Sequence, residues 1–160
     1  MREIIESGFK VTVPYRTSFR LQENKYYQKL SGIGLKEMDI GWWDNEKGKL
    51  IFLELKGIEI WQSSNEQERA HTYLVKSLKE KISDVLLIMS AIWLSTKVGE
   101  KLKEDLPEET HKFPGEGNLK FIILIDTPRS LKSLLTPVKD AINRKRPLRN
   151  FLSNPKAQSI

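Results

Sequence analysis

The stretch KEMDIGWWDNEKGKLIFLELKG, residues 36–57, decides the fold, because it holds two strand-like segments around a short polar turn. Residues 36–44 and 49–58 carry the apolar and aromatic side chains, and Asn45-Glu46-Lys47-Gly48 between them is typical of a hairpin loop. A four-residue loop places residue 44 opposite residue 49 and fixes every other pair. We therefore predict an antiparallel hairpin with a defined register.

This register gives each face of the hairpin its own character, since directly opposed residues share a face and faces alternate along a strand. One face is wholly apolar and is expected to be core. Its pairs are Met38 with Leu55, Ile40 with Leu53, and Trp42 with Ile51.

The other face carries charge at the end away from the turn. It places Asp39 opposite Glu54 and Glu37 opposite Lys56. Opposed like charges destabilise a strand pair, and a divalent cation between the two carboxylates would remove that conflict. Magnesium suits such a site, because it takes oxygen ligands and needs only one or two carboxylates. A structural alternative stays open: a Glu37–Lys56 ion pair, with Asp39 protonated or paired with an arginine.

Size and composition indicate one soluble domain over residues 1–160. The chain has 160 residues and no cysteine, which excludes disulfides, thiolate metal sites and a cysteine nucleophile. The longest apolar run, residues 85–94, is too short to cross a bilayer, and the N-terminus does not resemble a signal peptide. We expect a cytoplasmic protein without membrane contact.

Positive charge gathers at the C-terminal end. The net charge is +6, and residues 129–160 contain eight basic residues and a single acid, Asp140. Such asymmetry favours a polyanionic partner, most commonly nucleic acid, although a solvated tail is the simpler alternative. The expected contacts to backbone phosphates are Arg144, Lys145, Arg146 and Arg149.

Periodicity predicts the remaining elements. Residues 18–31 are ambiguous between helix and loop. The predicted helices are 2–7, 65–82, 91–105 and 130–145, and the predicted strands are 9–15, 84–89 and 119–126. Interleaved helices and strands favour an α/β (α+β) domain, with a mixed central β-sheet flanked by helices.

The segments MDIGWW and LELKG resemble the signature of the PD-(D/E)XK nuclease superfamily, an aspartate at the start of one strand and E-x-K on the next. Together with SGFKVTVPYRTS, they are most similar to archaeal-type Holliday-junction resolvases. The resemblance implies a restriction-endonuclease-like core over about the first 90 residues, in the order helix, strand, strand, strand, helix, strand. Met38 stands where many members have proline, which leaves open an inactive member that binds without cutting.

The resemblance also implies roles for individual residues. Asp39, Glu54 and the Leu55 carbonyl would ligate Mg²⁺ or Mn²⁺, and Lys56 would orient the attacking water or stabilise charge on the phosphate. An additional acidic ligand would come from the first helix or the segment after it, and the candidates are Glu3, Glu6 and Glu23. Arg16 and Arg20 would contact phosphates if their segment borders the site.

These observations predict a metal-dependent DNA endonuclease that hydrolyses phosphodiester bonds. It would be structure-selective, like a junction resolvase, or of restriction or homing type, and it would act as a homodimer. Two alternatives stay open. One is a non-catalytic nucleic-acid-binding protein with a degenerate nuclease fold, and the other is an interaction module whose basic tail docks on an acidic protein.

Overall fold

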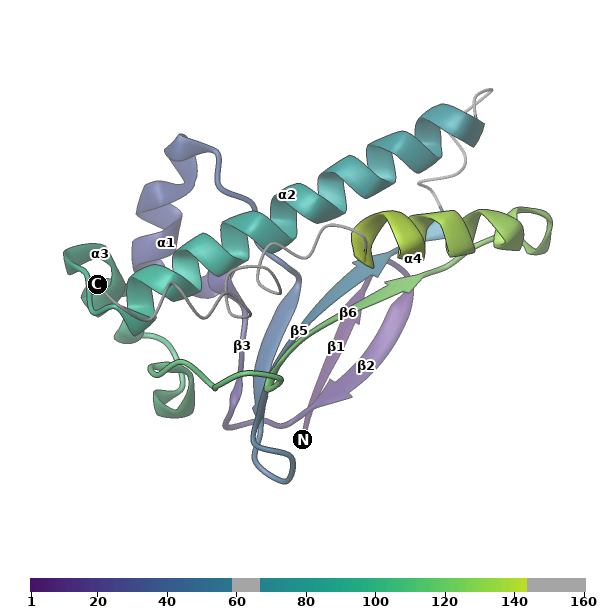
Figure 1. Ribbon diagram of the computed structural model, residues 1–160. Helices are drawn as coiled ribbons and strands as arrows, with labels where there is room; N and C mark the ends of the chain where they lie inside the picture. The colour runs from purple at the N-terminus through teal and green to yellow at the C-terminus, as the bar shows by residue number, and fades with distance from the viewer. Residues whose placement is uncertain (59–66, 144–160) are drawn as a thin grey trace.

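The computed structural model describes residues 1–58 and 67–143 and shows a mixed α+β architecture (Figure 1). A four-stranded mixed sheet has the order β3-β4-β5-β6, and β1 and β2 form a separate two-stranded sheet. The strands are β1 Arg2–Glu6, β2 Phe9–Val13, β3 Ser18–Phe19, β4 Ile40–Asp44, β5 Lys49–Lys56 and β6 Leu119–Ile125. The helices are α1 Lys25–Leu30, α2 Gln67–Trp93, α3 Lys97–Lys103 and α4 Leu135–Asn143. Short 3₁₀ helices cover Leu21–Glu23, Ser31–Ile33, Glu108–Thr110 and Arg129–Leu134.

The predicted hairpin of β4 and β5 is confirmed, including its register. Ile40 pairs with Leu53, and Asp44 pairs with Lys49. The Asp44 carboxylate accepts hydrogen bonds from the backbone N–H groups of two turn residues, Glu46 and Lys47, each at 3.1 Å. Gly48 then takes a positive φ of 59°, which a side chain would disfavour. Turn chemistry and alternation together therefore determine this part of the sheet.

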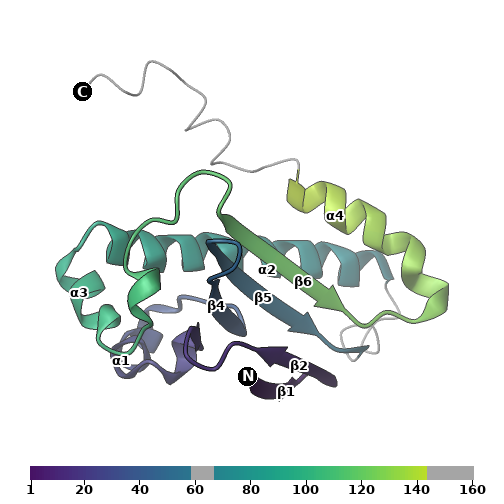
Figure 2. The same ribbon diagram turned by 90° about the horizontal axis from the view of Figure 1, so that it is seen from below.

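Both faces of the main sheet are buried. The face with Ile40, Leu53 and Leu55 packs against Ile4 and Val13 of the β1–β2 hairpin. On the opposite face, a second cluster joins Phe52 to apolar side chains of α2 and α3, and Figure 2 shows α2 on the far side of the sheet from β1 and β2. The charged groups at the end of β5 thus lie beside a covered surface.

Met38 belongs to the cluster beneath α2, and not to the face of Leu55 where alternation places it. The reason is that β4 begins at Ile40, so the residues before it are outside the ladder. Strand periodicity does not apply to them.

The predicted helix at residues 2–7 is wrong, because this segment is the strand β1. Ser7 and Gly8 both have positive φ, 49° and 77°, and they connect Glu6 directly to its partner Phe9. Such a two-residue turn matches the twist of a β-hairpin. The sheet is accordingly covered by helices on one face and by this hairpin on the other.

The predicted strand at residues 84–89 is also wrong, because α2 continues without interruption from Gln67 to Trp93. The apolar run DVLLIM continues the helical stripe, with Val85, Met89 and Ile92 buried at helical spacing. The chain then turns at Ser95, which has a φ of 52°, and forms α3. The prediction of one helix over 91–105 is therefore replaced by the end of α2 and a separate α3.

The predicted strand at 119–126 is confirmed as β6, which pairs parallel to β5. The basic C-terminal helix predicted for 130–145 is α4 where it is described, after a 3₁₀ helix that ends at Leu134. Val138 of α4 packs with Leu74, Val75 and Leu78 of α2 in a third apolar cluster. Within residues 1–58 and 67–143, no single helix is long and apolar enough to cross a membrane, although one bent helix pair passes by length and composition alone.

Candidate functional site

The aspartate of the signature lies just outside the sheet, where it completes the edge of β5. Its Oδ2 accepts a hydrogen bond of 2.6 Å from the backbone N–H of Leu55. The Lys56 carbonyl accepts a hydrogen bond from the Asp126 N–H on the β6 side. Because the direction of the backbone groups alternates along a strand, the N–H and carbonyl of Leu55 point to the β4 side. The Asp39 carboxylate thus occupies the position that a backbone carbonyl would take if β4 extended further.

Glu54 is the most buried charged group of the site, with an exposed fraction of 0%. Its Oε1 lies 2.7 Å from Lys56 Nζ and 2.6 Å from Lys81 Nζ. Its Oε2 is buried and has no hydrogen-bond partner among the described residues. A buried acceptor without a partner carries a desolvation cost, so this oxygen is the unsatisfied atom of the site.

Lys81, which the sequence reasoning missed, comes from α2 and reaches both acids. Besides its contact with Glu54, its Nζ lies 3.8 Å from Asp39 Oδ1. The two carboxylates therefore share one ammonium and face the same side of the sheet. A signal was present in the sequence: Lys81 falls on the buried stripe between Leu78 and Val85, where an apolar residue is expected.

Burial raises the pKa of the Asp39 carboxyl above its ordinary value, and the nearby Glu54 carboxylate raises it further. The Leu55 N–H, Lys81 and Lys56 oppose this rise without cancelling it. These contacts therefore offset only part of the free-energy cost of burying the ionised Asp39 carboxylate.

The loop that leads into Asp39 is fixed by contacts to α1 and α2. The Tyr27 hydroxyl donates to the Glu37 carboxylate, and the Lys36 N–H donates to Asp84 at 3.0 Å. The predicted Glu37–Lys56 pair is therefore wrong, because the chain leaves the ladder before Ile40. Tyr27 itself is buried at 4% exposure and so forms part of the core beneath this loop.

Arg20 also contacts this loop. Its Nε donates to the Asp39 carbonyl at 3.1 Å, and its Nη2 donates to Glu6 Oε2 at 2.6 Å. This side chain was expected to contact phosphates, but the structure places it between β1 and the backbone of Asp39. Arg20 therefore links Glu6 of β1 to the backbone of Asp39.

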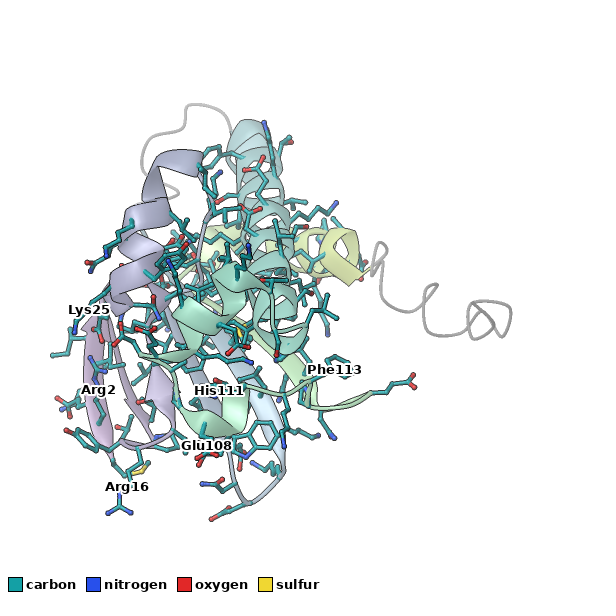
Figure 3. All side chains as sticks on the ribbon, turned by 90° about the vertical axis from the view of Figure 1, so that its left-hand side faces the viewer. Arg2, Arg16, Lys25, Glu108, His111 and Phe113 are labelled. Carbon is teal, nitrogen blue, oxygen red and sulfur yellow. The ribbon has the colours of Figure 1, made fainter. Side chains whose placement is uncertain are left out.

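Arg16 lies at the other end of β3. The residue after it, Thr17, makes two hydrogen bonds to the backbone of Trp43, near the hairpin turn. Its hydroxyl donates to the Trp43 carbonyl, and its carbonyl accepts from the Trp43 N–H. Figure 3 shows Arg16 pointing away from the body of the protein. The structure therefore does not bring Arg16 to the acidic pair.

The candidates for an additional acidic ligand do not join the pair either. Glu23 is 3.0 Å from Arg2, and Glu3 is 2.8 Å from Lys10. Across the described ranges, no group of three or more His, Cys, Asp or Glu side chains is placed to hold a metal. Arg144, Lys145, Arg146 and Arg149 lie outside the described residues.

Asp39 and Glu54 nevertheless fit a magnesium ion that keeps several waters. Both are oxygen donors, and Glu54 Oε2 is buried without a partner among the residues that the structure describes. The carbonyl and the N–H of a strand residue point to the same side, so the Leu55 carbonyl faces the Asp39 side as well. With Lys56 and Lys81, the four side chains carry equal numbers of positive and negative charges.

No family model, curated protein or solved structure matches this chain.

Proposed function

We propose that this protein is a metal-dependent DNA endonuclease that hydrolyses phosphodiester bonds. The observation that carries the proposal is the buried Glu54, whose Oε2 has no partner in the described structure and whose neighbours are Asp39 and Lys56. An acidic pair with an unsatisfied oxygen and an adjacent ammonium is the arrangement that a phosphodiester-cleaving metal site needs.

The topology supports a relationship to the PD-(D/E)XK nucleases. The order β3, β4, β5, α2, β6 follows the strand, strand, strand, helix, strand part of the expected core, with two differences. Additional helices, α1 and α3, lie between β3 and β4 and between α2 and β6, and the last strand is Leu119–Ile125 and not a segment of the first 90 residues. The signature residues fall at the expected strand ends. The first helix of that core has no counterpart before β3, where the chain forms the β1–β2 hairpin instead.

Each side chain has a distinct role in this proposal. Asp39 and Glu54 would hold Mg²⁺ or Mn²⁺, with the Leu55 carbonyl as a further oxygen. The bound ion would activate a water and neutralise charge on the scissile phosphate. Lys56 would donate to a phosphate oxygen or orient the attacking water, and Arg20 fixes the backbone from which Asp39 projects.

DNA is the proposed substrate because of the basic segment 129–160. Cleavage of a junction, or of both strands of a duplex, requires two sites, so the proposal includes a homodimer. Selectivity for junctions and activity of restriction or homing type are both compatible with this site.

The test is cleavage of supercoiled plasmid and of a four-way junction with Mg²⁺ or Mn²⁺, with a chelator as the negative control. Asp39→Asn and Lys56→Met should each lower the cleavage rate about a hundredfold or more while DNA binding persists. Lys47→Met is the matched control, because Lys47 is an exposed lysine of the hairpin turn and should leave the rate unchanged. Full activity of the Asp39→Asn variant would contradict the proposal.

A second candidate is a nucleic-acid-binding protein with a degenerate nuclease site. It is favoured by the contact of both Lys56 and Lys81 with Glu54 and by the lack of a third acid within the described part of the chain. Such a protein would bind DNA in the presence of either metal without cutting it.

A further inference from the structure

Lys81 occupies the position between the two carboxylates where a bridging cation would be expected. Its Nζ is 2.6 Å from Glu54 Oε1 and 3.8 Å from Asp39 Oδ1. Within the described residues, Lys56 forms an ion pair with Glu54 alone. The two lysines of the site are therefore not equivalent, because only Lys81 is shared by both acids.

We propose that Lys81 is an internal counter-ion that a divalent metal must displace, so that this residue sets the metal affinity of the site. This inference rests on the proposed function. A single ammonium that contacts both carboxylates neutralises them in part, and it repels a second cation that approaches the same two carboxylates.

The flexibility of its side chain explains why Lys81 is the group that moves. Glu54 is fully buried on β5, and Asp39 is held by the Leu55 N–H. The Lys81 side chain is 19% exposed and has a flexible four-carbon stem, so its ammonium can turn towards solvent while its Cα remains on α2. Displacement then needs a change of side-chain rotamer and no movement of the sheet.

The placement of Lys81 also explains how Glu54 is tolerated in the metal-free protein. A buried carboxylate is strongly unfavourable unless it is paired and hydrogen-bonded. Lys81 supplies a close contact from the helix that covers this face, while Lys56 supplies the other from the strand. A bound metal would take over the role of Lys81.

The experiment measures Mn²⁺ binding to the full-length chain by calorimetry and by the electron paramagnetic resonance of free Mn²⁺. Lys81→Met and Lys81→Gln should bind Mn²⁺ about tenfold or more tightly than the wild type, because the competing charge is gone. Lys76→Met is the matched control on the same helix, since Lys76 is 76% exposed and should leave affinity unchanged. The glutamine variant is included because it retains a hydrogen-bond donor for Glu54 if the methionine variant folds poorly.

Thermal unfolding gives an independent readout. Without metal, the melting temperature of Lys81→Met should fall, because Glu54 loses one of its two partners. Mn²⁺ should then raise the melting temperature of this variant by more than that of the wild type.

The outcomes separate the two proposals. Equal or weaker Mn²⁺ binding by both Lys81 variants would overturn the counter-ion role and leave the proposed metal site intact. Absence of Mn²⁺ binding in the wild type and in every variant would overturn the proposed function, and the counter-ion role with it.

Discussion

Asp39 makes two separate structural contributions, one through its backbone and one through its side chain. Its carbonyl accepts from Arg20, and its carboxylate accepts from the Leu55 N–H where β4 has ended. The same carboxylate is buried beside Glu54, which makes its ionised form unfavourable. A buried carboxylate whose pKa stays raised despite contacts with Leu55 and Lys81 is consistent with a site that takes up a further cation.

The raised pKa of Asp39 makes a prediction about stability. A carboxyl whose folded pKa lies above its unfolded value lowers stability as the pH rises from the unfolded value of 3.8 through the folded pKa. The loss is complete above the folded pKa and absent well below 3.8. Asp39→Asn should therefore be more stable than the wild type at pH 7 without metal. The difference should vanish as the pH falls below 3.8. Urea unfolding of both proteins at the two pH values measures it.

The amide introduced by Asp39→Asn would keep an acceptor for the Leu55 N–H, so the comparison isolates the charge. Lower stability of the variant than of the wild type at pH 7 would contradict this prediction. It would mean that Lys81 and the Leu55 N–H stabilise the ionised carboxylate by more than its burial destabilises it.

At the scale of elements, turn chemistry explains both hairpins, β1–β2 and β4–β5, although the sequence-based prediction used it only for the second. The turn that ends at Gly48 determined the register from sequence. Asp39 lies outside this ladder, and its proximity to Glu54 is seen in the Lys81 ammonium that both carboxylates contact. At residues 2–7 the two-residue turn Ser7–Gly8 was the decisive signal, and Ile4 and Ile5 then alternate between buried and exposed. The family pattern favours a helix there, and the turn overrides it.

The apolar run at 84–89 could not be assigned from its own composition, because a short apolar run fits a buried strand or a buried helix equally well. Its place in the helical stripe of α2 was visible only with the preceding residues. Lys81 was missed for a related reason: a lysine on a helix is usually solvated, and only the position of β5 shows that this one faces two acids.

The corner between α2 and α3 offers a test at this scale. A Cβ on Gly99 would lie 1.9 Å from the Ala91 carbonyl oxygen, a backbone atom that cannot yield without a shift of the helix. Gly99→Ala should therefore destabilise the protein by roughly 1–3 kcal/mol in chemical unfolding. Gly32→Ala is the control, since nothing lies within 4 Å of its added Cβ. Equal stability of the two variants would show that α3 does not pack tightly on α2.

At the scale of the whole molecule, the proposed DNA binding should depend on salt through the basic C-terminal segment. Residues 144–160 contain five basic residues and no acid. Removal of this segment should weaken binding to duplex DNA and make the dependence of log K on log salt concentration less steep, by up to about 4. A salt titration of binding by fluorescence anisotropy measures both effects.

Removal of residues 150–160 alone is the control, because this piece carries a single basic residue, Lys156. It should leave the slope nearly unchanged. An unaltered slope after the longer truncation would assign the phosphate contacts to residues 1–143.

The length of α2 has a mechanical consequence. At 27 residues the helix is about 40 Å long. Its N-terminal half is anchored on Val138 of α4, and its C-terminal half is anchored in the cluster around Phe52. Lys81 lies where these two anchorages meet. Because a helix resists bending, a force that tilts α4 against the sheet would move α2 as a unit and Lys81 with it. A displacement of α4 would therefore change the distance from Lys81 to Glu54 at the end of β5.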